Sequence, residues 1–527
     1  MDPVGQLLHD IAEALPAGRT ELRRLKIRTA TGTGAPLIRN DALLTRYRAE
    51  VSGGVRAPSE PLERILTLNG IRSQSGIATI TVITEPFACP GRCVYCPTEA
   101  RAPKSYLTNE PAVMRALRSD YDPYRQVWSR LQALDETGHP TDKLELIIKG
   151  GTWSFYPEPY QREFIRRCFD AANDFRSAAR SPGESPALEH AQQRNETAAC
   201  RMIGITIETR PDYVDDAEIR RLRELGVTRV ELGVQSLEEE VLRLIVRDHG
   251  TAEVREATRR LKDVGFKVAY HMMPNLPGAT PESDLRSTRT LFEDAGYQPD
   301  TMKLYPCVVI ETAELHAWWR QGRYVPYDDE TLLELLLEIK RLVPPYVRIE
   351  RVIRDIPSTS IQAGCRITNL REAVQRRLKA RGLACRCIRC RQLREDAQGD
   401  FRLVRREYPA SSGTEIFLSF EETAGDRLAS LLRLRIPSAA PVPFAALQGA
   451  ALIRELHTYG RHVPLHDRQE DAAQHRGFGW QLMQEAERIA HEEFGRRRVA
   501  VIAGIGAREY YRRLGYETQD TYMVKTL

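Results

Sequence analysis

Residues 77–96 read IATITVITEPFACPGRCVYC, a short β-rich run followed at once by three cysteines. The apolar run, bounded by turn residues, predicts a buried strand. Cys89, Cys93 and Cys96 have the spacing C-x3-C-x2-C on the loop that follows it. Three thiolates on one loop can hold three irons of a [4Fe–4S] cluster and leave the fourth iron open. A zinc knuckle is the alternative, but a closed zinc site needs a fourth ligand, and the sequence supplies none nearby.

The alternation of strand and helix continues from this run to about residue 356. Further apolar runs at residues 144–150, 202–208, 229–235, 267–273 and 301–306 are expected to be strands, and residues 347–356 can add another. Amphipathic segments that end in Gly separate several of them, as helix C-termini prefer. This α/β pattern predicts a partial (β/α)6 barrel with its chemistry just after the strands. Residues 174–200, rich in Ala, Ser, Pro and Gln, are expected to be a surface insertion without chemistry.

Length and charge place this barrel within a larger protein. A chain of 527 residues has room for three or four domains, which excludes a single small binding module. Net charge is only +5, yet residues 1–75 hold eleven Lys and Arg against eight Asp and Glu, and residues 371–406 hold twelve against four. The first twenty residues lack the pattern of a secretory signal, and no apolar run is long enough for a membrane span. We expect a cytoplasmic protein that makes no membrane contact and whose basic segments flank a catalytic body.

A second cysteine group lies in the basic segment. Residues 385–390 read CRCIRC, and Cys365 lies twenty residues upstream of Cys385. Four thiolates that include one C-x2-C pair are typical of a tetrahedral structural zinc site. The prediction is Zn²⁺ bound by Cys365, Cys385, Cys387 and Cys390, and free thiols are the alternative.

The C-terminal part has a different pattern of strand-like and helix-like segments, and it contains a glycine-rich loop. Residues 474–479 read QHRGFG, which fits the Q/R-x-x-G-x-G/A loop of GNAT acetyltransferases. Its glycines let backbone N–H groups face a diphosphate at a helix N-terminus. The apolar run GAALIRELHTYG (449–460) precedes the loop, and REYYRRLGY (508–516) follows it. We expect four parts: a basic segment over 1–75, the barrel over 76–356, a basic linker over 357–406 and a mixed α/β GNAT domain over 407–527.

These motifs together resemble one known family. Tyr95, between the second and third cysteines, belongs to the radical-SAM signature. The combination closely resembles the family of the catalytic subunit of Elongator, radical-SAM and GNAT proteins that modify wobble uridines in tRNA. The motifs that carry this resemblance include NEPAVMRALRSDYDPY (109–124), KGGTWSFYP (149–157), ETRPDY (208–213), ELGVQS (231–236) and YMVKTL (522–527). It runs from about residue 20 to the C-terminus and is weak over 174–200.

The resemblance implies S-adenosylmethionine (SAM) and acetyl-CoA as cofactors. The positions expected near SAM are Lys149, Gly150, Gly151, Thr152, Glu208, Glu231, Gln235 and Lys303. Those expected to bind acetyl-CoA are Glu455, Leu456, His457, Thr458, Gln474, Gly477, Phe478, Gly479 and one of Tyr510 and Tyr511. Lys149 and these tyrosines are the expected catalytic residues, and Lys149 is an alternative contact for acetyl-CoA. A tight turn would equally explain the glycine pair, and salt bridges would explain the carboxylates.

The implied reaction joins the two cofactors on one substrate. A 5′-deoxyadenosyl radical would take hydrogen from the methyl group of acetyl-CoA, the carbon radical would add to carbon-5 of uridine, and thioester hydrolysis would leave 5-carboxymethyluridine. Protein lysine acetylation with a structural cluster is the alternative function, and a tRNA-binding scaffold is a third.

The substrate expected from the resemblance is a tRNA anticodon stem-loop, held by cations that contact its backbone. The basic residues expected to bind it are Arg23, Arg24, Lys26, Arg28, Arg376, Arg377, Lys379, Arg381, Arg386, Arg389, Arg391 and Arg394. Solvated helix faces are the alternative explanation for each basic run, and a homodimer is possible.

Overall fold

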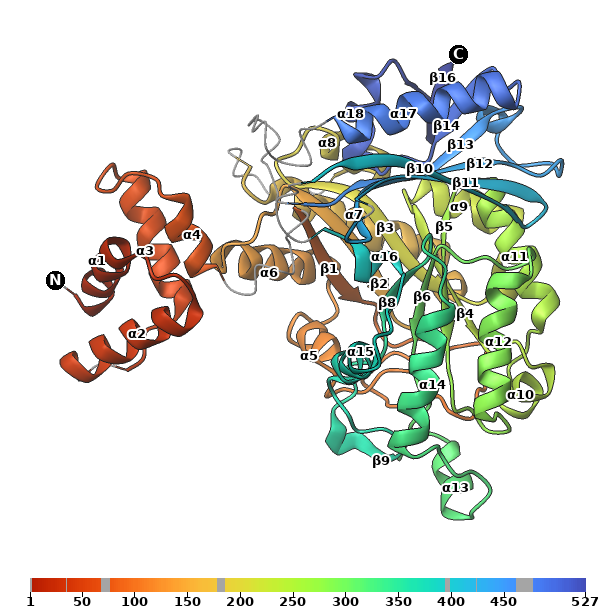
Figure 1. Cartoon of the computed structure of the whole chain (residues 1–527), viewed down its shortest axis with the longest axis horizontal. Coiled ribbons are helices and arrows are strands. Elements are labelled where there is room, and N and C mark those ends of the chain that lie inside the picture. Colours follow the sequence, from red (N-terminus) through yellow and green to blue (C-terminus); the bar gives the residue numbers. More distant parts are fainter. Residues whose placement is uncertain are drawn as a thin grey trace.

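The computed structural model describes residues 2–34, 36–67, 76–177, 185–393, 399–422, 424–460 and 477–527. Within them a helical bundle, a parallel barrel and a mixed-sheet domain follow one another along the chain (Figure 1). No helix in these ranges combines the length and the apolar character that a bilayer span requires.

The N-terminal bundle lies apart from the main body in Figure 1 and touches it at α6 (Pro123–Glu136). Its helices are α1 (Pro3–Ala14), α2 (Arg19–Thr33), α3 (Asn40–Ser52) and α4 (Glu60–Leu66). They enclose a small core of leucine and isoleucine side chains. Arg48 of α3 donates to the carbonyl of Asp135 on α6 at 2.7 Å, which ties the bundle to the barrel. On its surface, α2 exposes Arg23, Arg24 and Arg28.

Seven parallel strands form the barrel sheet in the order β1-β2-β3-β4-β5-β6-β8. They are β1 (Ile77–Ile83), β2 (Lys143–Lys149), β3 (Arg201–Thr209), β4 (Arg229–Gln235), β5 (Lys267–Met272), β6 (Thr301–Leu304) and β8 (Arg348–Arg351). The six predicted strands are confirmed, and the run at 347–356 supplies the seventh. Because all strands are parallel, their carboxyl ends meet at one edge of the sheet.

Helices follow the barrel strands along the chain, and several of them cover the outer face of the sheet (Figure 1). They are α5 (Pro111–Arg118) and α6 after β1, α7 (Glu158–Asp174) and α8 (Leu188–Asn195) after β2, α9 (Asp216–Glu224) after β3, α10 (Glu239–Leu244) and α11 (Thr251–Asp263) after β4, α12 (Pro281–Glu293) after β5, and α13 (Leu315–Arg320) and α14 (Asp329–Leu342) after β6. A small antiparallel pair, β7 (Val309–Ile310) and β9 (Ile361–Ala363), adjoins them. The linker contains α15 (Leu370–Ala380) and α16 (Ile388–Arg391).

The expectation of a surface insertion over 174–200 is wrong for the part that the structure describes. Helix α8 buries Leu188 and Ala191 in the barrel core. The side chain of Asn195 donates to Asn173 of α7 at 2.8 Å. Glu196 pairs with Arg512 of α18 (Arg508–Arg512) at 2.7 Å, so this segment also contacts the C-terminal domain.

The C-terminal domain is a mixed sheet with the strand order β10-β11-β12-β13-β14-β16-β15. Its strands are β10 (Phe401–Ala410), β11 (Gly413–Glu422), β12 (Arg427–Ile436), β13 (Ala451–Thr458), β14 (Arg498–Val501), β15 (Glu517–Gln519) and β16 (Tyr522–Thr526). Helix α17 (Phe478–Arg488) continues into a π-helical turn, Ile489–Glu493. The predicted fold class, a partial parallel barrel followed by a mixed α/β domain, is confirmed.

A buried ion network joins the two domains. Asp300, before β6, is fully buried and accepts from Arg454 of β13 at 2.6 and 2.9 Å. Arg435 of β12 donates to Asp263 at 2.6 Å. Backbone contacts reinforce the network: a Cβ at Gly504 would lie 2.1 Å from the carbonyl of Ile203 on β3. Only glycine fits there, so the two domains are packed rigidly against each other.

Candidate active site

One cavity of about 2190 Å³ runs between the barrel and the C-terminal domain. Its walls include the cysteine loop, the carboxyl ends of the barrel strands, the second half of β13, and residues at the start of α17 and α18. The two groups of residues predicted to bind different cofactors therefore open into the same space. Its lining holds 18 Lys and Arg against eight Asp and Glu, which suits polyanionic ligands.

The cysteine loop presents its three thiols to this cavity. Cys89, Cys93 and Cys96 are half-buried and line it. Between them Val94 is fully buried, and its backbone bonds to Ile245 at 3.2 Å, which anchors the loop. Burial, followed by the neighbouring Cys93, raises the pKa of Cys96 to about 12. Metal binding would stabilise the thiolate forms of three cysteines that share one loop and one cavity wall, so the loop fits an iron–sulfur cluster held by three cysteines.

Basic and small residues surround the thiols. Arg247 donates to the sulfur of Cys93 at 3.5 Å. A Cβ at Gly91 would lie 2.7 Å from Arg210, so the loop passes close to a second guanidinium. These cations offset the negative charge that thiolates would place here.

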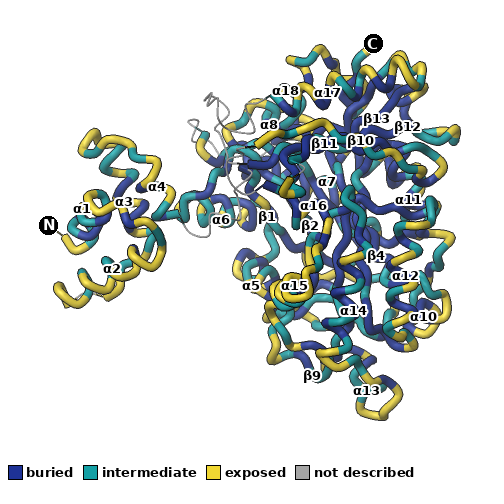
Figure 2. The backbone as a smooth tube through the Cα atoms, viewed as in Figure 1, coloured by how far each residue is buried: buried dark blue, intermediate teal, exposed yellow. Residues whose placement is uncertain are grey.

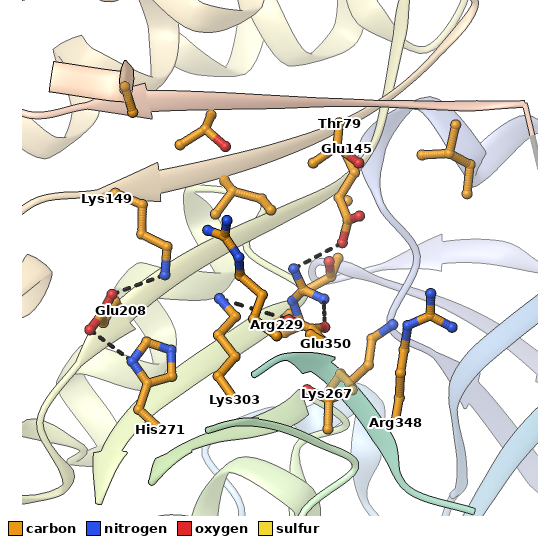
Figure 3. Close-up of a pocket in the computed structure, with 18 of the residues that line it drawn as sticks. Thr79, Glu145, Lys149, Glu208, Arg229, Lys267, His271, Lys303, Arg348 and Glu350 are labelled. Carbon is orange, nitrogen blue, oxygen red and sulfur yellow. Dashed lines mark hydrogen bonds and ion pairs between the residues drawn. The ribbon is translucent and has the colours of Figure 1, made fainter. Parts of the chain in front are cut away.

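A buried polar cluster forms the floor of the cavity at the ends of β2 to β6 (Figure 3). Lys149 bonds to Glu208 at 2.9 Å and also contacts Glu231. Lys303 bonds to both oxygens of Glu231 at 2.6 Å. His271 lies between the carboxylates, with Nδ1 3.0 Å from Glu208 and Nε2 2.7 Å from Glu231. These five side chains come from the five neighbouring strands β2 to β6, and the register of the sheet brings them together.

Mutual charge compensation sets the protonation of this cluster. Burial opposes the charges of Lys149 and Glu231, but their attraction to each other and to neighbouring groups outweighs it. The pKa of Lys149 is therefore raised well above its usual value, and that of Glu231 is held well below. Burial lowers the pKa of Lys303 to about 8 against the pull of Glu231. Lys149 is thus a cation held at the cavity surface, where an anionic group of a bound ligand can meet it.

The residues predicted to bind SAM differ in whether they line the cavity. Glu231 is fully buried behind Lys149 and does not line the cavity, whereas Glu208 and Gln235 do. A Cβ at Gly150 would lie 1.9 Å from Thr84, so close packing against β1 already requires glycine there. His271 was not predicted; the signal was a histidine inside the apolar run 267–273.

On the opposite wall, β13 diverges from β14. The two strands pair only over Ala451–Ile453, while Glu455–Thr458 pair with β12 alone. The register of β13 against β12 shifts between Arg433 and Leu434. Among the residues that the structure describes, no strand pairs with the other edge of Glu455–Thr458, which faces the cavity. An amide-bearing chain such as pantetheine can pair with such an edge.

The residues around this edge differ in how far they reach the cavity. Tyr510 is 41% exposed and lines it, and its hydroxyl would lie 3.4 Å from a Cβ at Gly479. Tyr511 is buried in the domain core and packs edge-to-face on Tyr516. Phe478 stacks on Phe420 in the same core, 4.4 Å between ring centroids. Tyr510 is therefore the tyrosine best placed to meet a ligand.

Gly477 has a φ of 70° at the N-terminus of α17, a conformation that favours glycine. Gln474 lies outside the described residues. The Glu455 carboxylate is engaged by Lys267 at 2.6 Å and Arg433 at 2.8 Å. That side chain therefore links the domains, and only its backbone remains for a ligand.

The second cysteine group contains three cysteines rather than four. The thiols of Cys385, Cys387 and Cys390 lie within 4.8 Å of one another. Cys365, the predicted fourth ligand, lies outside this group and its thiol bonds to Asp329, so its role as a ligand stays a prediction. Hydrogen bonds from Cys385 and Cys390 hold the pKa of Cys387 well below its usual value, which suits a metal ligand.

The basic residues of the linker do not form one free surface. Arg377 and Arg381 pair with Glu330 and Glu334 of α14 at 2.5 to 2.8 Å. Arg391 is buried against Glu421 and Asp426, so its prediction as a surface cation is wrong. Lys26 of α2 is half-buried against Asn40, and Arg394 lies outside the described residues. The exposed members of the predicted set in the linker are Arg376, Lys379, Arg381, Arg386 and Arg389, of which Arg389 lines the cavity.

Comparison with known families matches this architecture. The profile of the Radical SAM superfamily matches residues 86–289, and that of the Radical_SAM C-terminal domain matches residues 299–380. These ranges cover the cysteine loop, the barrel strands from β2 onward and α15.

Individual proteins are similar over nearly the whole chain. A tRNA uridine(34) acetyltransferase of Dehalococcoides mccartyi is 48% identical, covering 86% of this chain and 99% of its own. Human Elongator complex protein 3 is 39% identical, covering 99% of this chain and 96% of its own. The solved structure of archaeal Methanocaldococcus infernus Elp3 with an N-terminal deletion is 41% identical and superposes with a TM-score of 0.75, covering 86% of this chain and all of that one.

Proposed function

Because the chain belongs to the radical-SAM family that includes the tRNA uridine(34) acetyltransferases and Elongator complex protein 3, we propose that it modifies the wobble uridine of tRNA. The reaction we propose joins the methyl carbon of acetyl-CoA to carbon-5 of that uridine. The methyl group gives up one hydrogen atom to the SAM-derived radical, and the adduct would lose one electron and the carbon-5 proton, so that SAM is the net oxidant. Hydrolysis of the thioester would release CoA and leave a carboxymethyl group. The shared cavity carries the proposal, since it brings the cysteine loop and the β13 edge into one space. A new carbon–carbon bond requires both reactants in such a space.

The barrel side of the cavity would hold the radical-generating cofactors. Cys89, Cys93 and Cys96 would ligate a [4Fe–4S] cluster, and the polar groups at the strand ends would bind SAM beside it. When bound, these cofactors supply a carbon radical able to take hydrogen from a methyl group. Lys149 would contribute a fixed positive charge to an anionic ligand, with Glu208 and Glu231 holding it in place.

The C-terminal side would hold acetyl-CoA. Pantetheine amides would pair with the open edge of Glu455–Thr458, and the diphosphate would lie at the N-terminus of α17. Tyr510 would meet the thioester from α18. Its hydroxyl keeps its proton near neutral pH because burial raises the pKa of Tyr510, so it can donate a hydrogen bond to a carbonyl oxygen.

The test of this function follows a label from one cofactor to the other. With the reconstituted enzyme, SAM, a reductant and tRNA, we expect methyl-deuterated acetyl-CoA to place deuterium in 5′-deoxyadenosine. Mass spectrometry of the tRNA should show 5-carboxymethyluridine at the wobble position. Protein lysine acetylation would move no methyl deuterium, so acetylated lysine with unlabelled 5′-deoxyadenosine would contradict the proposal.

We further propose that Cys385, Cys387 and Cys390 bind Zn²⁺ and hold the linker against the barrel. The buried ammonium of Lys340 lies 3.9 Å from the sulfur of Cys390 and would offset part of the thiolate charge. Three thiolates leave one coordination position for a further ligand.

Elemental analysis tests this zinc site. The Cys387→Ser/Cys390→Ser variant should lose the zinc that the wild type holds, because a single thiolate binds it far more weakly. The matched control is Cys168→Ala, which removes a buried thiol of α7 far from this group. Full zinc occupancy in the double variant would rule out the site.

A further inference from the structure

A second hollow lies on α5 and α6, beside the mouth of the cavity. It encloses about 530 Å³. Its lining consists of Arg115, Arg118, Ser119, Tyr124, Arg125, Trp128, Ser129, Arg130 and Ala133. We call it the α5–α6 groove. Resting on the proposed function, we propose that this groove binds the sugar–phosphate backbone of the RNA substrate, next to the nucleotide that enters the cavity.

Helix geometry aligns the groove's basic side chains. Arg115 and Arg118 are three residues apart on α5 and so share one of its faces. Arg125 and Ser129 are four residues apart on α6 and share a face in the same way. The two helices present these faces to one hollow. The groove is therefore lined by cations from both sides.

Two of these cations, Arg115 and Arg118, are poorly neutralised by the described part of the protein. Within the described residues, Arg115 and Arg118 have no carboxylate at ion-pair distance, whereas Arg125 pairs with Asp120 at 2.8 Å. Burial and then the nearby charge of Arg130 lower the pKa of Arg115. Like charges brought together in this way are stabilised by an anion from outside the chain. Phosphate oxygens suit them, because guanidinium groups bind phosphate through paired hydrogen bonds.

Aromatic rings accompany the cations. Trp128 is half-buried, stacks on Tyr124 with 5.9 Å between centroids, and meets Phe175 edge-to-face at 5.3 Å. These contacts fix the indole at the wall of the groove. Basic side chains interleaved with fixed aromatic rings are typical of surfaces that bind RNA, because the rings pack against riboses or unstacked bases.

The groove's position favours a substrate that also reaches the cavity. Arg115, Arg130 and Ala133 line both the groove and the cavity, so the two spaces adjoin. The bundle contacts α6 at Asp135, two residues beyond Ala133, where Arg48 bonds to it. In Figure 2 the helices of the bundle carry exposed residues over much of their surface. An RNA strand lying in the groove would thus pass the cavity close to the bundle that carries the basic helix α2.

Two variants of opposite effect test the groove. The Arg118→Glu/Arg115→Gln double variant should weaken tRNA binding about tenfold at moderate salt, because phosphate contacts are lost. For the same reason, the slope of log Kd against the logarithm of the salt concentration should fall by about one to two. Asp120→Asn should tighten tRNA binding, because it frees Arg125. Asparagine tolerates the φ of 51° at this position. Binding is measured by fluorescence anisotropy with a labelled tRNA transcript.

Controls separate the groove from the proposed function. Arg289→Glu on α12 reverses an exposed charge away from the groove and should leave tRNA binding unchanged. Acetyl-CoA affinity should stay at the wild-type value in every groove variant. Wild-type tRNA affinity in the double variant would overturn the groove even if the wild type makes the modified nucleoside. A wild type that makes no such nucleoside would instead overturn the proposed function. A selective loss of acetyl-CoA binding would assign the groove to the cofactor and contradict the proposal.

Discussion

The Cys93→Ser variant should form no 5′-deoxyadenosine above the level of a control that lacks enzyme. Three thiols on one loop are available for three irons, so the loss of one leaves an incomplete ligand set. Cys93 is the most informative of the three, because its sulfur also accepts a hydrogen bond from Arg247 at 3.5 Å. Serine is a poor iron ligand at neutral pH because its hydroxyl stays protonated. Iron content and 5′-deoxyadenosine, both measured after anaerobic reconstitution, should fall together.

The loop itself should survive this substitution. Its anchor is Val94, which is buried and whose carbonyl accepts from the backbone of Leu315 at 2.8 Å. The variant should therefore retain its thermal stability and its affinity for acetyl-CoA. Cys168→Ala, in the core of α7, is the matched control and should keep full iron content and activity. If Cys93→Ser cleaved SAM at the wild-type rate, the three-cysteine assignment would be incorrect.

The barrel could be predicted from the sequence because each of its strands is recognisable from a short stretch of residues. Runs such as 229–235 and 267–273 are rich in apolar residues on both faces, as expected of strands that are buried along nearly their whole length. The cysteine loop was equally readable, since its ligands lie within eight residues of one another. Both features are contained in short windows of the chain.

Features that depend on distant parts of the chain were missed. The bundle α1–α4 is held by a few leucines in an otherwise polar segment, which the basic composition concealed. Strand β10 largely alternates exposed and half-buried residues, and it begins within the predicted linker and runs past its expected end at residue 406. Cys365 fitted a zinc site by spacing alone, but the tertiary fold places its thiol elsewhere. His271 joined the active-site cluster only through pairing of β4 with β5.

The basic residues of the α5–α6 groove were also not predicted from the sequence. Arg115 and Arg125 lie in a stretch that carries no conspicuous charge run, because Asp120 and Asp122 alternate with them. Folding removes Asp122 from the groove by pairing it with Arg167 at 2.5 Å. Local charge counts therefore understate the positive potential that the tertiary structure creates.

The same long-range ordering underlies the largest stability effect that we expect, in Asp300→Asn. Asp300 is fully buried, accepts two hydrogen bonds from Arg454, and lies 3.6 Å from Arg433 and 3.7 Å from Lys262. Removing its charge takes away the carboxylate that three buried cations share, and leaves Glu415 to compensate Arg454 and Lys262 and Glu455 to compensate Arg433. The loss of one member of a buried ion pair typically costs about 3–5 kcal/mol, because the remaining charge is not solvated. Urea unfolding measures this loss of stability, and hydrogen exchange at β6 and β13 should show that the interface opens first.

The destabilisation caused by Asp300→Asn should depend on pH, because the pKa of Asp300 is lowered in the folded protein. Although burial opposes it, attraction to Arg454 and the other cations holds the pKa of Asp300 well below its usual value. The ionised carboxylate therefore contributes stability that is complete above the unfolded-state pKa, about 3.9, and is lost as the pH falls below it. The difference in unfolding free energy between wild type and Asp300→Asn should be constant from pH 6 to 8 and shrink toward pH 3. Glu293→Gln, which removes a partner from an exposed pair with Arg289, should cost less than about 1 kcal/mol at every pH. An Asp300→Asn variant as stable as this control would mean that the two domains are held together by packing alone, and that the ion network does not fix the cavity between them.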